Sequence, residues 1–441
     1  MTTKTVTHCE EYGVFRRRAF LGKTLQAASA FVLGNVMVSF YGRPSVRVAM
    51  ASPNTGPRGD TFVCIFLRGG ADSLSMIVPH ADNEYHAQRD STRIAAPNDL
   101  QVDSQQRAIN LDDFFGLHPK LAPLQEIYNA NDMAFIHATG QPNASRSHFE
   151  AMKMVERGVE NNGVYTGWLG RHLASYDTDN QSPLRAISIG KMLPASLSGE
   201  VPALAFKSID KYHLRGNKTQ QKADMQALLQ NFYQSDDPLS LTANKTFAAM
   251  DTLSRINTEN YQPRGRAYPQ TKFGEDMRTV AQLIREDVGV EVACVDKGGW
   301  DTHATQGGAE GNLATKLDDL GQTLRAFYED IQNEKDNVTL VVMSEFGRRV
   351  KENAANGTDH GHGGMMMLLG GGIQGGQVYT QWPGLHPDQL ENNRDLKITT
   401  DYRDILGELI TKRLNNPHVG TVFPNYTVNE LGVAVPRSSN Q

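Results

Sequence analysis

The chain has 441 residues, of which 44 are basic, 49 are acidic and 39% are hydrophobic. This is the composition of an ordinary globular protein, long enough for two or three domains, although single large α/β domains often reach this length. The slightly acidic balance, without a basic run, makes nucleic acid an unfavourable partner.

The N-terminal 51 residues predict an export signal. Arg17–Lys23 (RRAFLGK) matches the twin-arginine signature, a weakly apolar stretch at about 25–40 follows, and Ala49–Ala51 (AMA) offers a cleavage site. The apolar stretch is too short and too interrupted for a stable membrane span, with a retained leader or anchor as the alternative. We therefore expect transport by the twin-arginine translocase to the periplasm or the cell exterior, and a mature chain of residues 52–441.

Removal of this signal changes the charge and the cysteine content. Residues 52–441 hold 37 basic and 47 acidic side chains, a net charge of −10. Polyanionic partners are therefore disfavoured, although a local basic pocket is compatible with this charge. Cys9 leaves with the signal, and Cys64 and Cys294 each lie in an apolar, strand-like run. We favour two buried thiols, with a disulfide as the alternative that an exported protein permits.

The first half of the mature chain predicts two buried strands, each followed by polar residues. Thr61–Leu67 is a continuous apolar run that leads through two glycines to Asp72. A helix at 119–128 precedes a short strand at 133–137. A further helix is expected to begin near Ser147, which forms an S-x-x-E capping box with Glu150.

The start of that helix also provides candidate catalytic residues. Ser147 and Ser145 are the candidate nucleophiles, because a helix N-terminus favours a bound anion. Arg146 would neutralise a phosphate or sulfate group. For Ser147, the capping role and the catalytic role are equally supported by the sequence.

The second half predicts a β-α-β unit. A mostly helical stretch at 219–286 belongs to a helical insert or cap around 190–290, and a buried strand is expected at 288–295. An amphipathic helix from Leu313 leads into the apolar run Val338–Met343, and this order implies parallel strands. A further apolar run, at 365–369, returns to the sheet. Together these elements predict one α/β domain, a three-layer α/β/α sandwich with a mostly parallel sheet.

Acids and histidines follow three of the predicted core strands. They are Asp72; Asp301 and His303; and Glu345, Asp359, His360 and His362. Because ligands bind at the carboxyl ends of strands in open α/β sheets, we expect these side chains to share one functional edge. Carboxylate oxygens and imidazole nitrogens are ligands for zinc and other divalent metals. The sequence therefore predicts a metal site.

Each of these residues also has a structural alternative. Asp72 and Asp301 could cap turns or helices. Glu345 and Asp359 could form ion pairs with Arg348 and Arg349 instead of a site. His360 could hydrogen-bond the backbone of its glycine-rich loop.

Several motifs together resemble a known family. RRxFL, FLRGGADS, RSHFE, GGWDTH, SEFGR and GTDHGHGG are similar to those of the bacterial, twin-arginine-exported domain-of-unknown-function family "fifteen-oh-one". The resemblance covers essentially the whole chain. That family is placed in the alkaline phosphatase and sulfatase superfamily, which implies an alkaline-phosphatase-like α/β/α fold and a metallohydrolase site.

The resemblance also implies residue roles. Asp72 corresponds to a metal-ligand aspartate after the leading strand, and Ser147 or Ser145 to the start of the nucleophile helix. The other implied metal ligands are Asp301, His303, Glu345, and His360 or His362. The implied metal is zinc, with calcium, magnesium or manganese as alternatives.

Three departures from the superfamily pattern limit this assignment, and one of them is the spacing of Asp301 and His303, which is tighter than the usual Asp…His spacing. Phe346 stands where a histidine ligand is expected, which puts a complete two-metal site in doubt. Pro142 stands two residues before the Ala144–Arg146 triplet, where a sulfatase of the formylglycine type requires Cys or Ser.

The expected function is therefore metal-dependent hydrolysis of a small anionic ester, a phosphate or a sulfate. In this hypothesis Ser147, or a water molecule that the cation activates, attacks the ester, and Arg146 and Arg348 neutralise its charge. The alternative is a non-catalytic exported binding or assembly protein on a degenerate scaffold of the same fold.

Overall fold

The computed structural model describes residues 37–38, 60–142, 145–160, 163–214 and 219–437. The twin-arginine motif, the predicted cleavage site and Cys9 lie outside the described residues. Among the described helices, none is long and apolar enough to cross a membrane.

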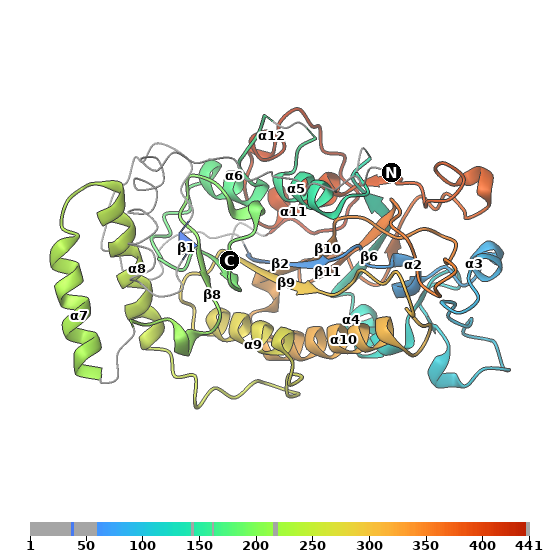
Figure 1. The fold of residues 1–441 in the computed structure, drawn as a ribbon, viewed down its shortest axis with the longest axis horizontal. Coiled ribbons are helices and arrows are strands. Elements are labelled where there is room, and N and C mark those ends of the chain that lie inside the picture. Colours follow the sequence, from blue (N-terminus) through green and yellow to red (C-terminus); the bar gives the residue numbers. More distant parts are fainter. Residues whose placement is uncertain (1–36, 39–59, 143–144, 161–162, 215–218, 438–441) are drawn as a thin grey trace, which may run out of the picture.

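The centre of the molecule is a ten-stranded sheet (Figure 1). Its strands are β1 (Met37–Val38), β2 (Thr61–Arg68), β6 (Met133–Gly140), β7 (Ala186–Ile189), β8 (Leu204–Phe206), β9 (Val292–Gly298), β10 (Val338–Ser344), β11 (Gly364–Leu369), β12 (Val378–Tyr379) and β13 (Thr400–Asp401). They are ordered β1-β8-β7-β9-β2-β10-β11-β6-β12, with β13 also beside β6. All neighbours are parallel except β1 with β8 and β11 with both β10 and β6.

Helices cover both faces of this sheet. One face carries α4 (Gln125–Asn129), α9 (Lys272–Arg285) and α10 (Asn312–Asp330), and the other carries α5 (His148–Arg157), α6 (Trp168–Ser175), α11 (Tyr402–Lys412) and α12 (Val419–Val422) (Figure 1). Side chains alternate along β2, so that Val63 and Ile65 pack in one core and Phe62 and Cys64 in the other. The predicted three-layer α/β/α architecture is confirmed.

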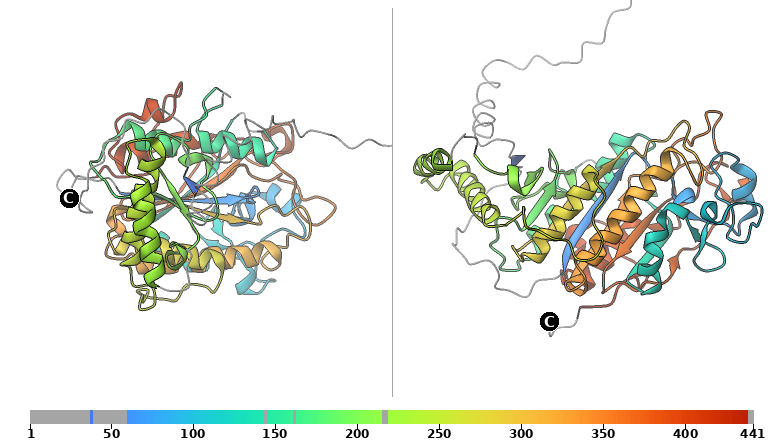
Figure 2. Two further views of the ribbon diagram at one scale, coloured as in Figure 1. Left: turned by 60° about the vertical axis from the view of Figure 1, so that its left-hand side comes forward. Right: turned by 90° about the horizontal axis from the view of Figure 1, so that it is seen from below.

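The predicted helical insert divides into two parts. Helices α7 (Thr219–Phe232) and α8 (Pro238–Ser254) stand at one end of the molecule, whereas α9 lies along the sheet (Figure 2). At the other end, α2 (Ser73–Met76) and α3 (Asn83–Gln88) adjoin a small sheet of β3 (Ile77–Val78), β5 (Gly116–Leu117) and β4 (Ile109–Asn110). The short 3-10 helices are η1 (Ser104–Gln106), η2 (Pro119–Leu124), η3 (Ala195–Leu197), η4 (Ile209–Lys211), η5 (Lys335–Asn337) and η6 (Pro387–Gln389).

The two cysteines are free, buried thiols. Cys64 on β2 and Cys294 on β9 are paired in the register of these parallel strands, and the two are not joined by a disulfide. A hydrogen bond with Cys64 and burial raise the pKa of the Cys294 thiol well above its usual value. This agrees with the favoured interpretation of two buried strand thiols.

The topology brings distant loops to one edge of the sheet. Strands β2, β6, β9 and β10 run in the same direction, so their carboxyl ends meet at that edge. Strand β11 runs in the opposite direction, so the loop before it arrives at the same edge. The segments that carry Asp301, Glu345 and His360 therefore meet at this edge of the sheet.

Candidate metal centre

Four side chains from three loops converge at this edge. His148 is the first residue of α5, Asp301 and His303 follow β9, and His360 precedes β11. Ligand atoms of His148, Asp301 and His360 lie within 4.8 Å of one another. We call these four residues the histidine–aspartate cluster.

The distances within the cluster are short. Asp301 Oδ1 lies 3.0 Å from His303 Nε2 and 3.1 Å from His360 Nε2, and these two imidazole nitrogens are 2.9 Å apart. His148 Nε2 lies 3.5 Å from Asp301 Oδ2. Ligands at roughly 2.1 Å from one cation are separated by roughly 3.4 Å in a tetrahedron, so these spacings suit a shared ion.

Each imidazole faces a hydrogen-bond acceptor with its outer nitrogen. Nδ1 of His148 faces Glu345 Oε1 at 2.7 Å, Nδ1 of His303 faces Asp359 Oδ1 at 3.3 Å, and Nδ1 of His360 faces the Arg146 carbonyl at 2.8 Å. For His148 this places the proton on Nδ1, because its Nε2 has no hydrogen-bond partner among the described residues, and Nε2 then presents a lone pair toward Asp301. In His303 and His360, Nε2 also lies within hydrogen-bond distance of Asp301 Oδ1. Three Nε2 atoms therefore face one carboxylate.

The charge of Asp301 is maintained by the neighbouring loops. Its side chain is 45% exposed, and Arg348 donates to Oδ1 at 2.6 Å. Burial acts to raise the pKa of Asp301, but the hydrogen bonds from Arg348 and His360 outweigh it and lower the pKa to about 2. Burial also lowers the pKa of His360, which favours its neutral, ligating form. Both effects favour metal binding.

The donor set therefore fits a divalent transition metal. Imidazole nitrogen with carboxylate oxygen is the usual ligand set for zinc and related metals, whereas calcium and magnesium prefer oxygen alone. The buried Nε2 of His148 has no hydrogen-bond partner among the described residues. A cation between this nitrogen and Asp301 would satisfy both groups.

Three predicted ligands, Asp72, His362 and Glu345, are not in the cluster. Asp72 is fully buried in an ion pair with Arg89, whose Nη1 lies 2.6 Å from Oδ2, and it also accepts from Ser75 and Gln306. Burial acts to raise the pKa of Asp72, and Arg89 lowers it below the usual value. His362 is directed to Glu391, with 3.2 Å between Nδ1 and Oε2. Asp72 and His362 therefore have other partners beside the site, and the ligand roles expected for them stay predictions.

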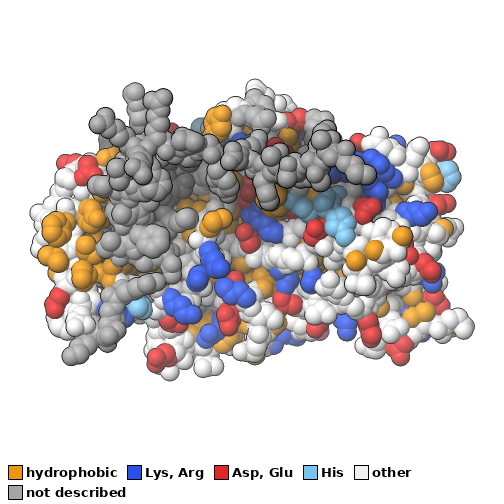
Figure 3. All heavy atoms as spheres, in the orientation of Figure 1, with side chains coloured by type: hydrophobic (Ala, Val, Ile, Leu, Met, Phe, Trp, Pro, Cys, Tyr) orange, Lys and Arg blue, Asp and Glu red, His pale blue; other side chains and the backbone are white. Residues whose placement is uncertain are grey.

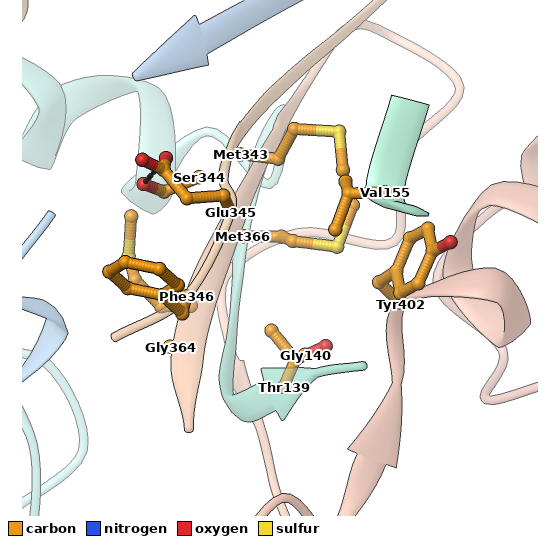
Figure 4. A pocket seen from close by; sticks show the side chains of 11 residues that line it. Thr139, Gly140, Val155, Met343, Ser344, Glu345, Phe346, Gly364, Met366 and Tyr402 are labelled. Carbon is orange, nitrogen blue, oxygen red and sulfur yellow. Dashed lines mark hydrogen bonds between the residues drawn. The ribbon is translucent and has the colours of Figure 1, made fainter. Parts of the chain in front are cut away.

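Glu345 has a different position from the one expected for a ligand. Its side chain is fully buried and contacts the outer nitrogen of His148. Glu345 and Ser344 point to one side of β10, and Met343 points to the other (Figure 4). Met343, Ser344 and Glu345 line a cavity of about 10 Å³, which has room for no more than about one water molecule.

The predicted anion-binding arginines are engaged by the protein. Arg348 is fully buried, and besides Asp301 it donates to the carbonyls of Gly69, Gly70, Trp300 and Thr358. Arg348 therefore connects the segments that follow β2, β9 and β10. Arg146 is paired with the buried Asp395. Arg349 is paired with Asp359, as the structural alternative proposed for these residues.

Ser147 stands at the expected helix start without the expected cap. It is the N-cap residue of α5, it is exposed, and its side chain accepts no hydrogen bond from the helix. Ser145 Oγ instead accepts from the Ser147 amide at 3.1 Å. The capping box is therefore not formed, and Ser147 directly precedes His148 of the cluster in the chain.

His148 is the cluster residue that the sequence analysis missed. It lies in the RSHFE motif, one residue after the candidate nucleophile. The signal that could have found it is its position after a buried strand, since β6 ends at the same edge as β9 and β10. The predictions for Asp301, His303 and His360 place all three in the same cluster. Figure 3 shows histidine side chains gathered between basic and acidic ones on one face of the molecule.

Comparison with known proteins gives a family and distant structural similarity. A family described as "Protein of unknown function (DUF1501)" matches residues 60–412. No curated protein matches the chain.

Solved structures with similarity to the chain are sulfatases and phosphatases. The PsFucS1 sulfatase from Pseudoalteromonas sp. is 11% identical with a TM-score of 0.34, over 86% of this chain and 74% of that one. The C-terminal periplasmic domain of EcEptC from Escherichia coli, in complex with Zn, is 11% identical with a TM-score of 0.32, over 88% and 92%. A mutant of TAB5 alkaline phosphatase with bound Mg is 9% identical with a TM-score of 0.28, over 84% and 99%. Similarity at this level says nothing about the reaction.

Proposed function

Because the chain belongs to the DUF1501 family, whose description assigns no activity, we propose a function from the site itself: an exported, metal-dependent hydrolase of phosphate or sulfate esters. The observation that carries this proposal is the convergence of three imidazole Nε2 atoms on the Asp301 carboxylate. A divalent cation at this place would accept the Nε2 lone pairs and balance the charge of Asp301, and it would provide the missing partner of His148 Nε2.

The residues that would hold the cation are His148, Asp301, His303 and His360. When bound, a divalent cation supplies charge stabilisation for a phosphoryl or sulfuryl oxygen and acidifies water. The exposure of Asp301 and His303, at 45% and 44% of their side chains, leaves the open side that a substrate needs. This openness distinguishes a catalytic site from a closed structural metal site.

The chain itself provides a nucleophile and an anion-binding helix end. Ser147 is exposed and uncapped, and its position at the N-terminus of the ten-residue helix α5 favours a negatively charged group. In the proposed reaction its oxygen attacks the phosphorus or sulfur atom and the alcohol of the ester leaves, or water attacks instead. Arg146 contributes positive charge beside the site if it releases Asp395 and pairs with the anionic substrate instead.

The test is metal analysis combined with a panel of phosphate and sulfate esters, using the purified full-length chain. We expect about one equivalent of transition metal and ester hydrolysis, both lost in His303→Ala. If Ser147 is the nucleophile, Ser147→Ala should abolish hydrolysis and still bind the metal. Ser145→Ala is the control, at the neighbouring serine. Stoichiometric metal without hydrolysis of any ester would contradict the hydrolase.

A second candidate function is a non-catalytic exported binding or assembly protein. The observation that favours it is the burial of Arg348 and the pairing of Arg146, which leave both predicted anion ligands occupied by the protein. For this function we expect less than one equivalent of metal and no hydrolysis. The metal analysis above therefore separates the two candidates.

Export itself belongs to the proposal. Its support is the RRAFLGK motif ahead of an apolar stretch. Cell fractionation of the native chain and of a variant with Arg17→Lys and Arg18→Lys tests the route. The native chain should reach the periplasm or the medium, and the variant should stay in the cytoplasm.

A further inference from the structure

We propose that Glu345 is a positioning residue that acts on the metal through His148, and not itself a ligand. The inference rests on the proposed metal centre and concerns how that centre obtains its fourth ligand. In the superfamily pattern this position, directly after the central strand, was expected to supply a ligand oxygen. The contacts of Glu345 place it on the opposite side of an imidazole ring from the other ligands.

The carboxylate of Glu345 is held by three hydrogen bonds. Oε1 accepts from the Gly69 amide at 2.8 Å and from His148 Nδ1 at 2.7 Å. Oε2 accepts from Ser344 Oγ at 3.0 Å. The side chain is fully buried, so removal from water is offset by these donors. A carboxylate fixed in this way by two neighbouring strand ends has little freedom to turn toward a cation.

This carboxylate determines which nitrogen of His148 is free. Because Oε1 only accepts, Nδ1 carries the proton and Nε2 carries the lone pair. That Nε2 is buried, has no hydrogen-bond partner among the described residues, and lies 3.5 Å from Asp301 Oδ2. A lone pair facing a carboxylate is unfavourable unless a cation lies between them. Glu345 thus prepares His148 as a ligand whose orientation is set before the cation arrives.

Phe346 completes the support of this ring. Its ring centroid lies 5.0 Å from that of His148 and 4.9 Å from that of His360. It is buried and forms an apolar wall beside both imidazoles. The aromatic residue that replaces the expected histidine therefore limits rotation of two ligands, and His148 supplies the nitrogen that Phe346 cannot.

Loss of the Glu345 charge should weaken metal binding without removing a ligand. A carboxylate behind a ligating imidazole fixes its tautomer and increases its basicity, and loss of such partners typically costs about 10–100-fold in affinity. Glu345→Gln keeps the size of the side chain but allows its amide to donate to Nδ1, which would move the proton to Nε2. Glu391→Gln is the matched control, since Glu391 lies beside His362 and outside the cluster.

The experiment measures Zn²⁺ affinity of the full-length chain by competition with a chelator, and the visible spectrum of the Co²⁺ form. We expect Glu345→Gln to bind one metal about 10–100-fold more weakly and Glu391→Gln to bind like the native chain. His148→Ala should also weaken binding, and the double variant should bind no more weakly than His148→Ala alone, because Glu345 acts only through that ring. If Glu345→Gln does not fold, Glu345→Asp, which withdraws the carboxylate from Nδ1, should give an intermediate loss.

Native affinity in Glu345→Gln, or a loss that adds fully to that of His148→Ala, would overturn this role. Absence of Zn²⁺ binding by the native chain would remove the metal centre and this inference together. Metal binding with the expected variant pattern but without ester hydrolysis would remove the proposed hydrolase alone and leave the role of Glu345 established.

Discussion

Two aspartates that follow core strands have opposite surroundings. Asp72 is sealed in the interior with Arg89, and both side chains are fully buried. Asp301 is nearly half exposed and faces three imidazoles. Arg89 also donates to the carbonyls of Val350 and Arg349, so the Asp72 pair connects the segment after β2 to the loop after β10. Asp72 therefore supports the loop that carries the site.

We expect Asp72→Asn to destabilise the protein and to leave metal affinity unchanged. Breaking a buried ion pair leaves the Arg89 charge unpaired, which typically costs about 3–5 kcal/mol in the free energy of unfolding. Urea unfolding measures this loss, and chelator competition on the folded fraction measures the affinity.

The control for this substitution is Asp296→Asn. Asp296 pairs with Arg68 at 2.9 Å but is 54% exposed, so its loss should cost less than about 1 kcal/mol. A strong loss of metal affinity in folded Asp72→Asn would contradict this assignment and return Asp72 to the ligand set.

At the level of elements, close backbone contacts hold the loop between β10 and β11 against the sheet edge. The Gly347 amide donates to the His362 carbonyl at 2.9 Å, and the Gly361 amide donates to the Gly347 carbonyl at 2.9 Å. A Cβ on Gly347 would lie 1.9 Å from the Gly363 carbonyl oxygen. His360 is thus positioned by a backbone crossing that accepts no side chain.

Gly347→Ala should therefore be destabilising, whereas Gly298→Ala should be neutral. Overpacking at such a contact costs about 1–3 kcal/mol or more, because the backbone must move. Gly298, at the end of β9, has nothing within 4 Å of an added Cβ, and its substitution should stay within about 0.5 kcal/mol. Thermal or urea unfolding of the two variants gives the comparison, and equal stabilities would contradict the contact.

Elements with strong hydrophobic patterns were predictable from the sequence. The runs at 61–67 and 338–343 correspond to β2 and β10, and the helix from Leu313 corresponds to α10. Strand β9 was expected at 288–295 but spans Val292–Gly298. The predicted start lies too far toward the N-terminus because Val288 and Val290 are apolar and buried without pairing in the sheet.

Pairing partners were not predictable, because they are set by contacts between distant segments. Whether β11 runs parallel or antiparallel depends on which strands it joins, and its apolar run carries no such information. Arg89 lies in a polar, irregular segment, and the sequence indicates no partner for its side chain. His148 follows a strand as Asp301 does, but the one acid near it, Glu150, was interpreted as part of a capping box, and its partner Glu345 is 197 residues away.

At the level of the whole molecule, three buried histidines set the response to acid. His118, His137 and His172 are buried outside the cluster. Burial lowers the pKa of His118 and His137 to about 4, and burial lowers the pKa of His172 to about 3. Each ring is therefore neutral in the folded protein at pH values where it is protonated in the unfolded chain.

An acidic group with the opposite effect is Asp276. Burial raises its pKa to about 6 despite the neighbouring Lys272, so its contribution to stability is present below about pH 4 and is lost as the pH rises through 6. The histidine contributions are present above about pH 6.5 and are lost as the pH falls toward 4. His118, His137 and His172 act in one direction and Asp276 in the other, so these histidines outweigh Asp276 between pH 6.5 and 5.

We therefore expect the free energy of unfolding to fall when the pH is lowered from 7 to 5. Each histidine contributes up to about 1.4 kcal/mol per pH unit below 6.5, and Asp276 offsets about the same amount below pH 6. The net loss at pH 5 is then up to about 4–5 kcal/mol, and urea unfolding at a series of pH values between 7 and 5 measures it.

His137→Gln should reduce the slope of the free energy of unfolding against pH by the equivalent of about one proton, because the glutamine side chain takes up no proton. His386, with 56% of its side chain exposed, is the surface control, and His386→Gln should change the free energy of unfolding at pH 7 by no more than about 0.5 kcal/mol. A free energy of unfolding that stays constant between pH 7 and 5 would contradict this prediction. It would show that the three buried rings become protonated in the folded state, through contact with solvent or an acceptor, and that the interior at these positions opens more easily than its packing indicates.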